Sequence, residues 1–225
     1  IVSADLIPGS GEAGDAFQVS SAAQLQALRD RVGEGDQIEL TDTLDFSPTT
    51  SEAWADGNGF EPLGSDETPF NGTLNGSGEA ITNLNISREE SSDTALFRVL
   101  DGEGTVESVE FRNINVSGGE NTGVVAGRNV GEINNVTVRG SNITGAENTS
   151  SIAGVNEATI NKTDIIDTAV NGSSNIGGIT GTNTGNVGNI SVENATVSGT
   201  GTIGGVVGNT EAAIENITVN ESKVD

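Results

Sequence analysis

Apolar residues recur every 27 positions through the second half of the chain. The spacing holds for three apolar columns and one glycine column: Ile133, Ile160, Val187 and Ile214; Val138, Ile165, Val192 and Val219; Ile143, Val170, Val197 and Val224; and Gly127, Gly154, Gly181 and Gly208. Val106, Phe111 and Val116 extend the apolar columns by one repeat. A constant period of this length is typical of a protein built from stacked structural repeats.

Within each repeat the pattern has the period of a β-strand. Segments such as "INNVTV", "VGNISV" and "IENITV" place apolar side chains at nearly alternate positions between Asn, Thr, Ser or Glu. Each repeat holds three such runs, separated by Gly and Asn, which tolerate the positive φ of tight corners. We therefore predict a parallel β-solenoid of about six coils, with about 27 residues and three short strands per coil, spaced about 4.8 Å apart. A β-sandwich would not need columns that recur at a fixed period.

A short amphipathic helix is predicted ahead of the repeats, over about 21–32. Ser21 and Gln24 have the spacing of a capping box, Leu25, Leu28 and Val32 share one face, and Gly33 follows the last turn. The expected role is a lid over the first coil, and the alternative is a partner-binding helix.

The segment after the helix predicts the first strands and a long loop. Ile38, Leu40, Leu44 and Phe46 alternate with polar residues, as in strands. The loop over about 47–70 contains four large apolar residues, for which we predict a small satellite core, with sugar stacking as the alternative: Trp54, Phe60, Leu63 and Phe70.

These patterns divide the chain into two parts. Residues 17–225 are predicted to form a single β-solenoid domain, with regular coils over about 71–225. Residues 1–16 are predicted to be an extended segment that adds a strand to a neighbouring subunit. The residues proposed for this assembly strand are Ile1, Val2, Ala4, Leu6 and Ile7. No helix or aromatic plug follows the last repeat, so we expect a further coil or a partner there.

Composition narrows the partners and the location. The 33 acidic and 9 basic residues give a net charge of −24, which disfavours nucleic acid and anionic membranes. The acidic residues are spread along the chain, which favours a halophilic, archaeal source and diffuse cation binding. Cys and His are absent and no apolar run could span a membrane, so we expect no cofactor, no specific metal site and no membrane insertion. The start at Ile1 suggests the mature part of an exported, extracellular protein.

Long segments of the chain resemble the GLUG-motif repeat proteins, extracellular β-solenoids of bacterial and archaeal surface proteins and adhesins. The segments are "FNGTLNGSGEAITNLNI", "DTALFRVLDGEGTVESVEFRNINVSG" and "IGGITGTNTGNVGNISVENATVSG". Ser150 and Ser151 depart from the pattern, since later repeats have a Gly pair there. The resemblance implies a right-handed parallel β-helix that has a structural role at the cell surface.

The sequence offers no catalytic residue. β-Helical polysaccharide lyases and hydrolases need clustered carboxylates with a basic residue, or a pair of acids. Asp164 and Asp167, the nearest acidic pair, should point in different directions. The arginines occupy different coil positions except for two that are 27 apart and should stack: Arg98, Arg128, and the pair Arg112 and Arg139. We therefore expect no enzyme.

Asn-X-Ser/Thr sequons are the abundant chemical motif. A repeat made of Asn, Ser and Thr generates them by composition alone, but an exported chain could carry N-linked glycans on some of them. The candidate acceptors are Asn71, Asn75, Asn85, Asn115, Asn135, Asn142, Asn148, Asn161, Asn171, Asn189, Asn194, Asn216 and Asn220.

The resulting hypothesis is a non-catalytic subunit of a cell-surface filament or surface layer. Its expected partners are further copies of itself or other cell-surface proteins. The alternatives are an adhesin module that binds a glycan or a host surface, and a virion spike or fibre. A polysaccharide lyase or hydrolase is the least favoured.

Overall fold

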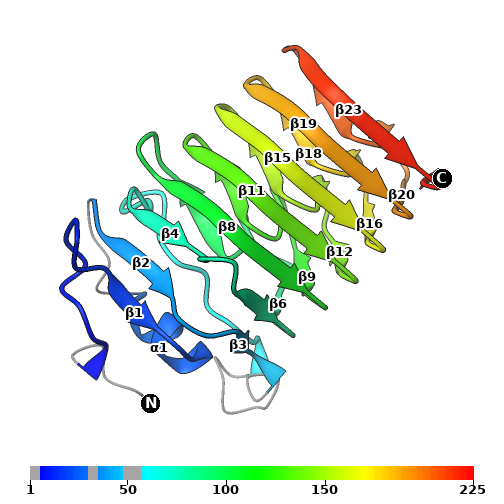
Figure 1. Cartoon of the computed structure of the whole chain (residues 1–225). Coiled ribbons are helices and arrows are strands. Elements are labelled where there is room, and N and C mark those ends of the chain that lie inside the picture. Colours follow the sequence, from blue (N-terminus) through cyan, green and yellow to red (C-terminus); the bar gives the residue numbers. More distant parts are fainter. Residues whose placement is uncertain (1–5, 30–34, 48–56) are drawn as a thin grey trace.

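The chain forms a parallel β-solenoid. A computed structural model describes residues 6–29, 35–47 and 57–225. Equivalent strands lie side by side from the N-terminal to the C-terminal end, so the chain advances by one coil in each repeat (Figure 1). The predicted fold is therefore confirmed, with about five regular turns of about 27 residues.

In the described ranges, four sheets run along the solenoid, and all pairings between their strands are parallel. The largest contains β1 (Phe17–Val19), β2 (Gln37–Leu40), β3 (Leu44–Asp45), β4 (Thr73–Asn75), β5 (Ala80–Thr82), β8 (Thr105–Arg112), β11 (Glu132–Arg139), β15 (Thr159–Ile166), β19 (Asn186–Glu193) and β23 (Ile214–Asn220). The second contains β7 (Phe97–Leu100), β10 (Ala126–Asn129), β14 (Ala153–Asn156), β18 (Thr180–Asn183) and β22 (Val207–Thr210).

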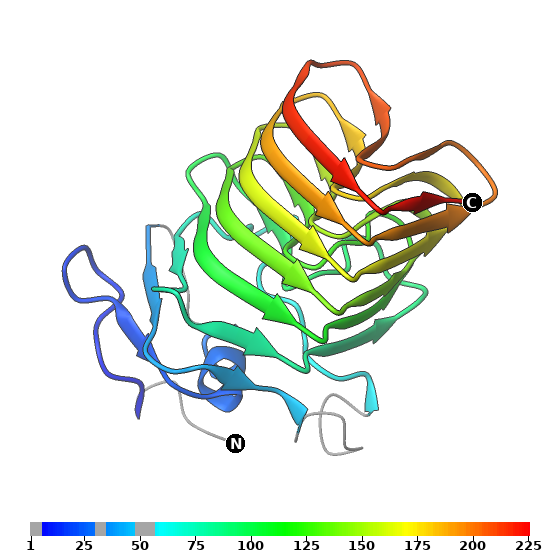
Figure 2. The same ribbon diagram turned by 45° about the vertical axis from the view of Figure 1, so that its right-hand side comes forward.

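The other two sheets are made of short strands. One contains β6 (Asn85–Arg88), β9 (Asn115–Gly118), β12 (Asn142–Thr144), β16 (Ala169–Gly172), β20 (Thr196–Gly199) and β24 (Lys223–Val224). The other contains β13 (Glu147–Ser150), β17 (Ser174–Gly177) and β21 (Ile203–Gly204), which add a fourth short strand to three of the turns. Figure 2 shows the sheets curving around a common interior.

The apolar columns of the sequence are columns in space. Ile133 pairs with Ile160, which pairs with Val187, and the other two columns keep the same register. These side chains point inward and are almost completely buried in one core, except in the last coil. Each buried aliphatic side chain stabilises the fold by about 1.5–3 kcal/mol, and stacking extends that burial from coil to coil.

The N-terminal helix closes the core, but it is shorter than predicted. Helix α1 covers Ala22–Ala27, and Val32 and Gly33 lie outside the described residues. Ser21 is the N-cap as expected, since its hydroxyl accepts a hydrogen bond from the Gln24 amide at 3.4 Å. The Gln24 side chain accepts from the Ser20 amide at 2.8 Å instead of from Ser21. Leu25 and Leu28 are buried in the same core as the coils.

The described part of the long loop belongs to the main core. Phe60, Leu63 and Phe70 are buried there, so the predicted satellite core is wrong for these residues. Phe60 meets Phe46 edge-on with ring centroids 5.5 Å apart, and Phe70 stacks on Phe97 at 4.4 Å. Buried rings cannot stack on a sugar in solvent. Trp54 lies outside the described residues.

The corners are made mainly by asparagine and other polar residues. The long strands bend at a column with φ between 49° and 56°: Ser108, Asn135, Lys162, Asn189 and Asn216. The glycine column, for which the sequence suggested the same role, does not adopt positive φ. A Cβ on Gly154 or Gly181 would lie 2.5 Å from backbone atoms of the preceding coil, at Asn121 and Asn148 respectively. These glycines are therefore required for close packing between coils.

Candidate functional site

A buried ladder of asparagines runs along one inner corner. The Nδ2 atom of Asn129 donates to Oδ1 of Asn156 at 2.7 Å, and Asn156 donates in the same way to Asn183, also at 2.7 Å. Asn183 then donates to the Thr210 hydroxyl at 3.2 Å. All three asparagines are fully buried. The apolar pattern of the sequence did not predict this ladder, although its residues are spaced by 27, because only apolar residues were expected inside.

A second ladder lies next to the glycine column. Asn121 donates to Asp93 at 2.9 Å, Asn148 donates to Asn121 at 2.8 Å, and Asn175 donates to Asn148 at 3.1 Å. All four residues have positive φ. Burial raises the pKa of Asp93 above its usual range, although the hydrogen bond from Asn121 acts in the opposite direction. A carboxylate therefore occupies a position that asparagine fills in the following coils.

We expect Asp93→Asn to stabilise the protein at neutral pH by about 0.5–1 kcal/mol, because it removes a half-buried charge and asparagine tolerates positive φ. A carboxyl whose folded pKa lies above its unfolded value destabilises the fold at higher pH. That penalty disappears as the pH falls below the unfolded pKa. The gain should thus shrink on acidification, as measured by thermal melts at several pH values. If the variant and the parent have the same melting temperature at neutral pH, the prediction is contradicted.

The predicted arginine stack is present on the outer face of the large sheet. Arg112 pairs with Arg139 in the register of β8 and β11. Both contact Glu110: Arg112 Nη2 lies 2.7 Å from Oε2, and Arg139 Nε lies 3.5 Å from Oε1. The hydrogen bond from Arg112 lowers the pKa of Glu110, and Glu110 raises the pKa of Arg112. The stack thus neutralises a carboxylate on the surface.

The nearest acidic pair has no shared site. Asp164 lies on β15, whereas Asp167 follows the strand with a φ of 51° and accepts from Nδ2 of Asn194 at 2.6 Å. Among the described residues there is no group of three Asp, Glu, His or Cys side chains that could hold a metal ion.

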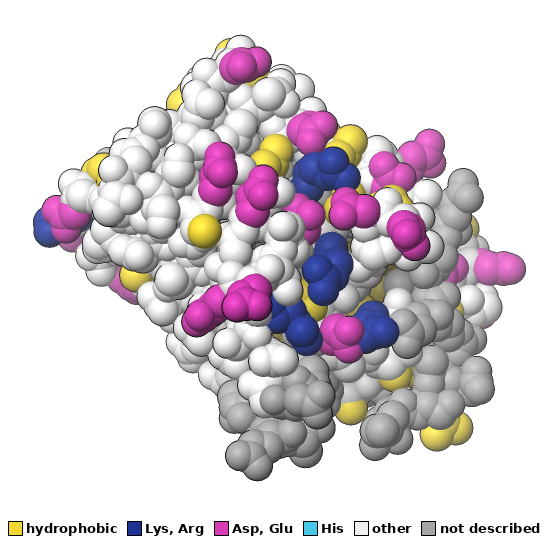
Figure 3. All heavy atoms as spheres, turned by 180° about the vertical axis from the view of Figure 1, so that it is seen from behind, with side chains coloured by type: hydrophobic (Ala, Val, Ile, Leu, Met, Phe, Trp, Pro, Cys, Tyr) yellow, Lys and Arg dark blue, Asp and Glu magenta, His cyan; other side chains and the backbone are white. Residues whose placement is uncertain are grey.

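Positive side chains gather with acidic ones near the N-terminal coils, on the face opposite to that of Figure 1 (Figure 3). Arg29 forms an ion pair with Glu61, and Arg128 Nη2 lies 3.3 Å from Asp66. Arg88 lies in the field of Glu61, Arg98 and Arg29, and its pKa is lowered mainly by burial. This mixed patch holds four of the nine cationic residues, but Glu61, Asp66 and Asp93 offset their charge.

The predicted glycosylation acceptors fall into two structural groups. In the first, Nδ2, the atom that would carry the sugar, already donates a hydrogen bond to a neighbouring coil: Asn115, Asn135, Asn142, Asn148, Asn171, Asn189, Asn194 and Asn216. Asn148 is also buried, at 8% exposure. The second group, in which Nδ2 makes no such bond to any described residue, contains Asn71, Asn75, Asn85, Asn161 and Asn220.

The described part of the predicted assembly strand is folded back on the domain. Residues 6–16 form turns instead of an extended segment, and Gln18 donates to the Pro8 carbonyl at 2.8 Å. Ile7 is buried in the core, whereas Leu6 is 73% exposed. Ile1, Val2 and Ala4 lie outside the described residues.

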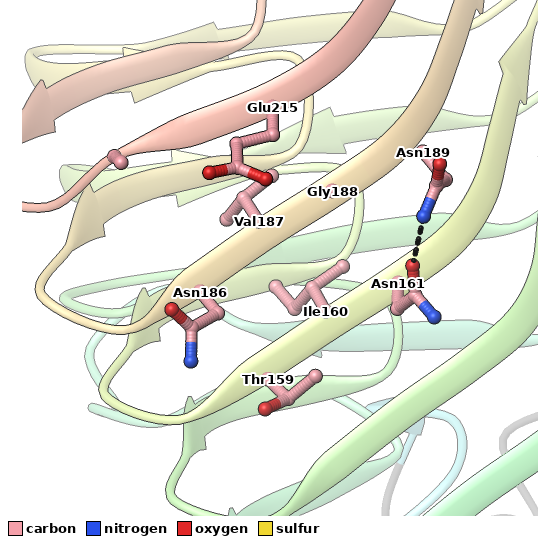
Figure 4. Close-up of a pocket in the computed structure, with 9 residues that line it drawn as sticks. Thr159, Ile160, Asn161, Asn186, Val187, Gly188, Asn189 and Glu215 are labelled. Carbon is pink, nitrogen blue, oxygen red and sulfur yellow. Dashed lines mark hydrogen bonds between the residues drawn. The ribbon is translucent and has the colours of Figure 1, made fainter.

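A small pocket opens on the large sheet along the neighbouring strands β15, β19 and β23, which belong to three successive coils (Figure 4). Its volume is about 260 Å³. It lies along an outward-facing column in register across the strands, which reads Glu107, Asn134, Asn161, Gly188 and Glu215. Gly188 thus leaves a gap between Asn161 and Glu215. Thr159, Asn186 and Asn189 complete the polar lining.

The chain is similar in sequence to parts of two known proteins and in fold to one solved structure. No family model matches the chain. Over 122 residues, 54% of the chain, it is 37% identical to halomucin of Haloquadratum walsbyi, of which it covers 1%. Over 129 residues, 56% of the chain, it is 32% identical to a candidate Gly-rich membrane protein of Evansella cellulosilytica, of which it covers 15%. The chain therefore spans a small part of either relative.

A solved structure supports the fold. A candidate immunoglobulin A1 protease from Bacteroides ovatus superposes with a TM-score of 0.69, over 96% of this chain and 69% of that one. The two sequences are 19% identical, which establishes similarity of fold alone. Within the described part of this chain, the helix is too short and too polar to span a bilayer.

Proposed function

We propose that this chain is a non-catalytic solenoid module of an extracellular, cell-surface protein, and that it acts as a subunit of a filament or surface layer. The observation that carries the proposal is the continuous stacking of apolar columns and asparagine ladders, which makes a rigid rod with few functional groups. The similarity to halomucin supports a surface location and a halophilic, archaeal source. Membership of the GLUG-motif repeats is part of this proposal.

The acidic surface fits this role. With a net charge of −24, the chain would repel its neighbours at low ionic strength. Concentrated salt shortens the Debye length to about 3 Å at 1 M and removes most of that repulsion. We therefore propose that association is favoured by salt, and that bound cations are diffuse. Glycans would be carried on the asparagines with a free Nδ2 that lie outside the pocket, such as the exposed Asn220.

The last described coil supplies the surface for association. Its inward-facing column members Val219 and Val224 are 46% and 49% exposed, and Ile214 is 39% exposed. Strands β22, β23 and β24 lie at the ends of their sheets, where one backbone edge is unpaired. A further coil or a second copy would cover these groups.

Sedimentation in molar NaCl and electron microscopy test this proposal. We expect concentration-dependent self-association, which Val219→Asp should abolish because it places a charge on the apolar end. Thr218→Asp, on the solvent-facing side of the same strand, is the matched control and should leave assembly unchanged. A protein that stays monomeric at all concentrations, or cleaves immunoglobulin A1 or acidic polysaccharide, would overturn the proposal.

A further inference from the structure

Gly188 is a glycine that the fold does not require. It lies inside strand β19 without positive φ, and a Cβ there would come no closer than 3.8 Å to any atom beyond its chain neighbours. Its counterparts in the neighbouring coils are Asn161 and Glu215, so the position accepts long side chains. A glycine inside a strand weakens it, and such a residue often marks close approach by backbone or ligand. At Gly188 no backbone atom of another strand lies closer than 3.8 Å to the position of such a Cβ.

The gap at Gly188 is surrounded by groups that can form hydrogen bonds. In Figure 4 the Glu215 carboxylate reaches from β23 toward Val187 and Gly188, while Thr159 and Asn161 lie on β15 across the gap. Asn189 donates to Asn161 at 2.8 Å, which orients the Asn161 amide. In the described structure the side chains of Thr159, Asn186 and Glu215 make no hydrogen bonds to other residues. The pocket therefore presents a carboxylate, amides and a hydroxyl to solvent.

The charge and size of the pocket limit the classes of ligand that can bind there. An anion would meet Glu215 and the field of a protein with a net charge of −24. A divalent cation such as Ca²⁺ needs six to eight oxygen ligands, usually with several carboxylates, and the lining contains one carboxylate. The volume of about 260 Å³ lies below the roughly 300–1,000 Å³ of common small-molecule pockets. A single neutral, hydroxyl-rich ring fits these limits.

We propose that the Gly188 pocket binds one neutral sugar residue, such as a hexose at the end of a glycan. The Glu215 carboxylate accepts hydrogen bonds from sugar hydroxyls, and the Asn186 and Asn161 amides donate to ring or hydroxyl oxygens. The open strand surface at Gly188 lets the ring approach the backbone. The pocket borders the association surface because Glu215 belongs to β23, but sugar binding is measured on the dilute monomer, so the two proposals can fail separately.

Titration by NMR tests the site with defined probes. The methyl glycosides of glucose, galactose, mannose and N-acetylglucosamine are added to ¹⁵N-labelled protein, together with a separate CaCl₂ arm. We expect at least one glycoside to shift the amide signals of Gly188, Asn189 and Glu215. Glu215→Gln should weaken binding about tenfold, because a hydrogen bond to a charged group is lost. Tighter binding of an oligosaccharide with the same terminal sugar would identify a glycan as the source.

Gly188→Asn is the decisive variant, because it refills the column and should remove the shifts while the fold is kept. Gly102→Asn is the matched control, since a Cβ at Gly102 meets no atom within 4 Å and its position is remote from the pocket lining. Its binding should equal that of the parent. The proposal is overturned if no glycoside shifts these signals, if CaCl₂ alone shifts them, or if Gly188→Asn binds as well as the parent.

Discussion

Replacing Gly181 with alanine is expected to lower the melting temperature by roughly 6–12 °C, which corresponds to about 3 kcal/mol. The new Cβ would lie 2.5 Å from the Asn148 Cα and 2.6 Å from its carbonyl carbon. These are backbone atoms of the preceding coil, held by the second asparagine ladder, so no side-chain rotation relieves the clash. The two coils would have to separate locally, which breaks the strand pairing between β14 and β18.

Gly188→Ala is the matched control for this prediction. The substitution is identical and only seven residues away, but its Cβ has no atom within 3.8 Å. Its melting temperature should equal or slightly exceed that of the parent, since alanine restricts the unfolded chain more than glycine does. If the two variants melt at the same temperature, close packing is not the reason for the glycine column. Circular dichroism at constant salt is sufficient for the comparison.

Asn156→Ala is the second large prediction, with an expected loss of about 3–5 kcal/mol. The substitution removes both ladder bonds of Asn156, so Nδ2 of Asn129 and Oδ1 of Asn183 each lose a partner inside the core. A buried polar group left without a partner costs about 1–3 kcal/mol, and the lost side-chain volume adds to this. Chemical denaturation gives the difference in free energy of unfolding.

An exposed ladder provides the comparison for Asn156. Asn142 donates to Oδ1 of Asn115 at 3.4 Å, but its side chain lies in solvent and water replaces the lost bond. We expect Asn142→Ala to change stability by less than about 1 kcal/mol. Similar losses for the two variants would show that burial does not determine the strength of the ladders.

The period of the sequence was sufficient to predict the coil, the register and the inward columns. Ile133, Ile160 and Val187 could be aligned without a structure because a stacked repeat places equal side chains at equal positions. The same reasoning assigned the wrong cause to Gly154 and Gly181. Sequence shows that no side chain is tolerated, but the backbone atom that excludes it belongs to another coil and becomes visible only in three dimensions.

Polar residues inside the solenoid were harder to predict. Alternation assigns asparagines to the outer face, and a buried amide is favourable only when its partners are also in place. Asn129, Asn156 and Asn183 recur in the sequence at the 27-residue spacing of the apolar columns. That spacing was the feature from which the buried ladder could have been predicted. For the Gly188 pocket, the only sign in the sequence was one glycine that interrupts a column of outward-facing residues. Phe60 and Phe70 joined the main core through contacts with distant residues, which no local pattern encodes.

The hydrogen bonds of the two inner ladders run in opposite directions along the rod. In the buried ladder each asparagine donates toward the C-terminal coil, whereas Asn121, Asn148 and Asn175 donate toward the N-terminal coil. Aligned amide dipoles reinforce one another within a row, as peptide dipoles do in a helix. Because the two rows point in opposite directions, their axial dipoles largely cancel. Within these two rows, a further coil therefore adds little net dipole along the rod.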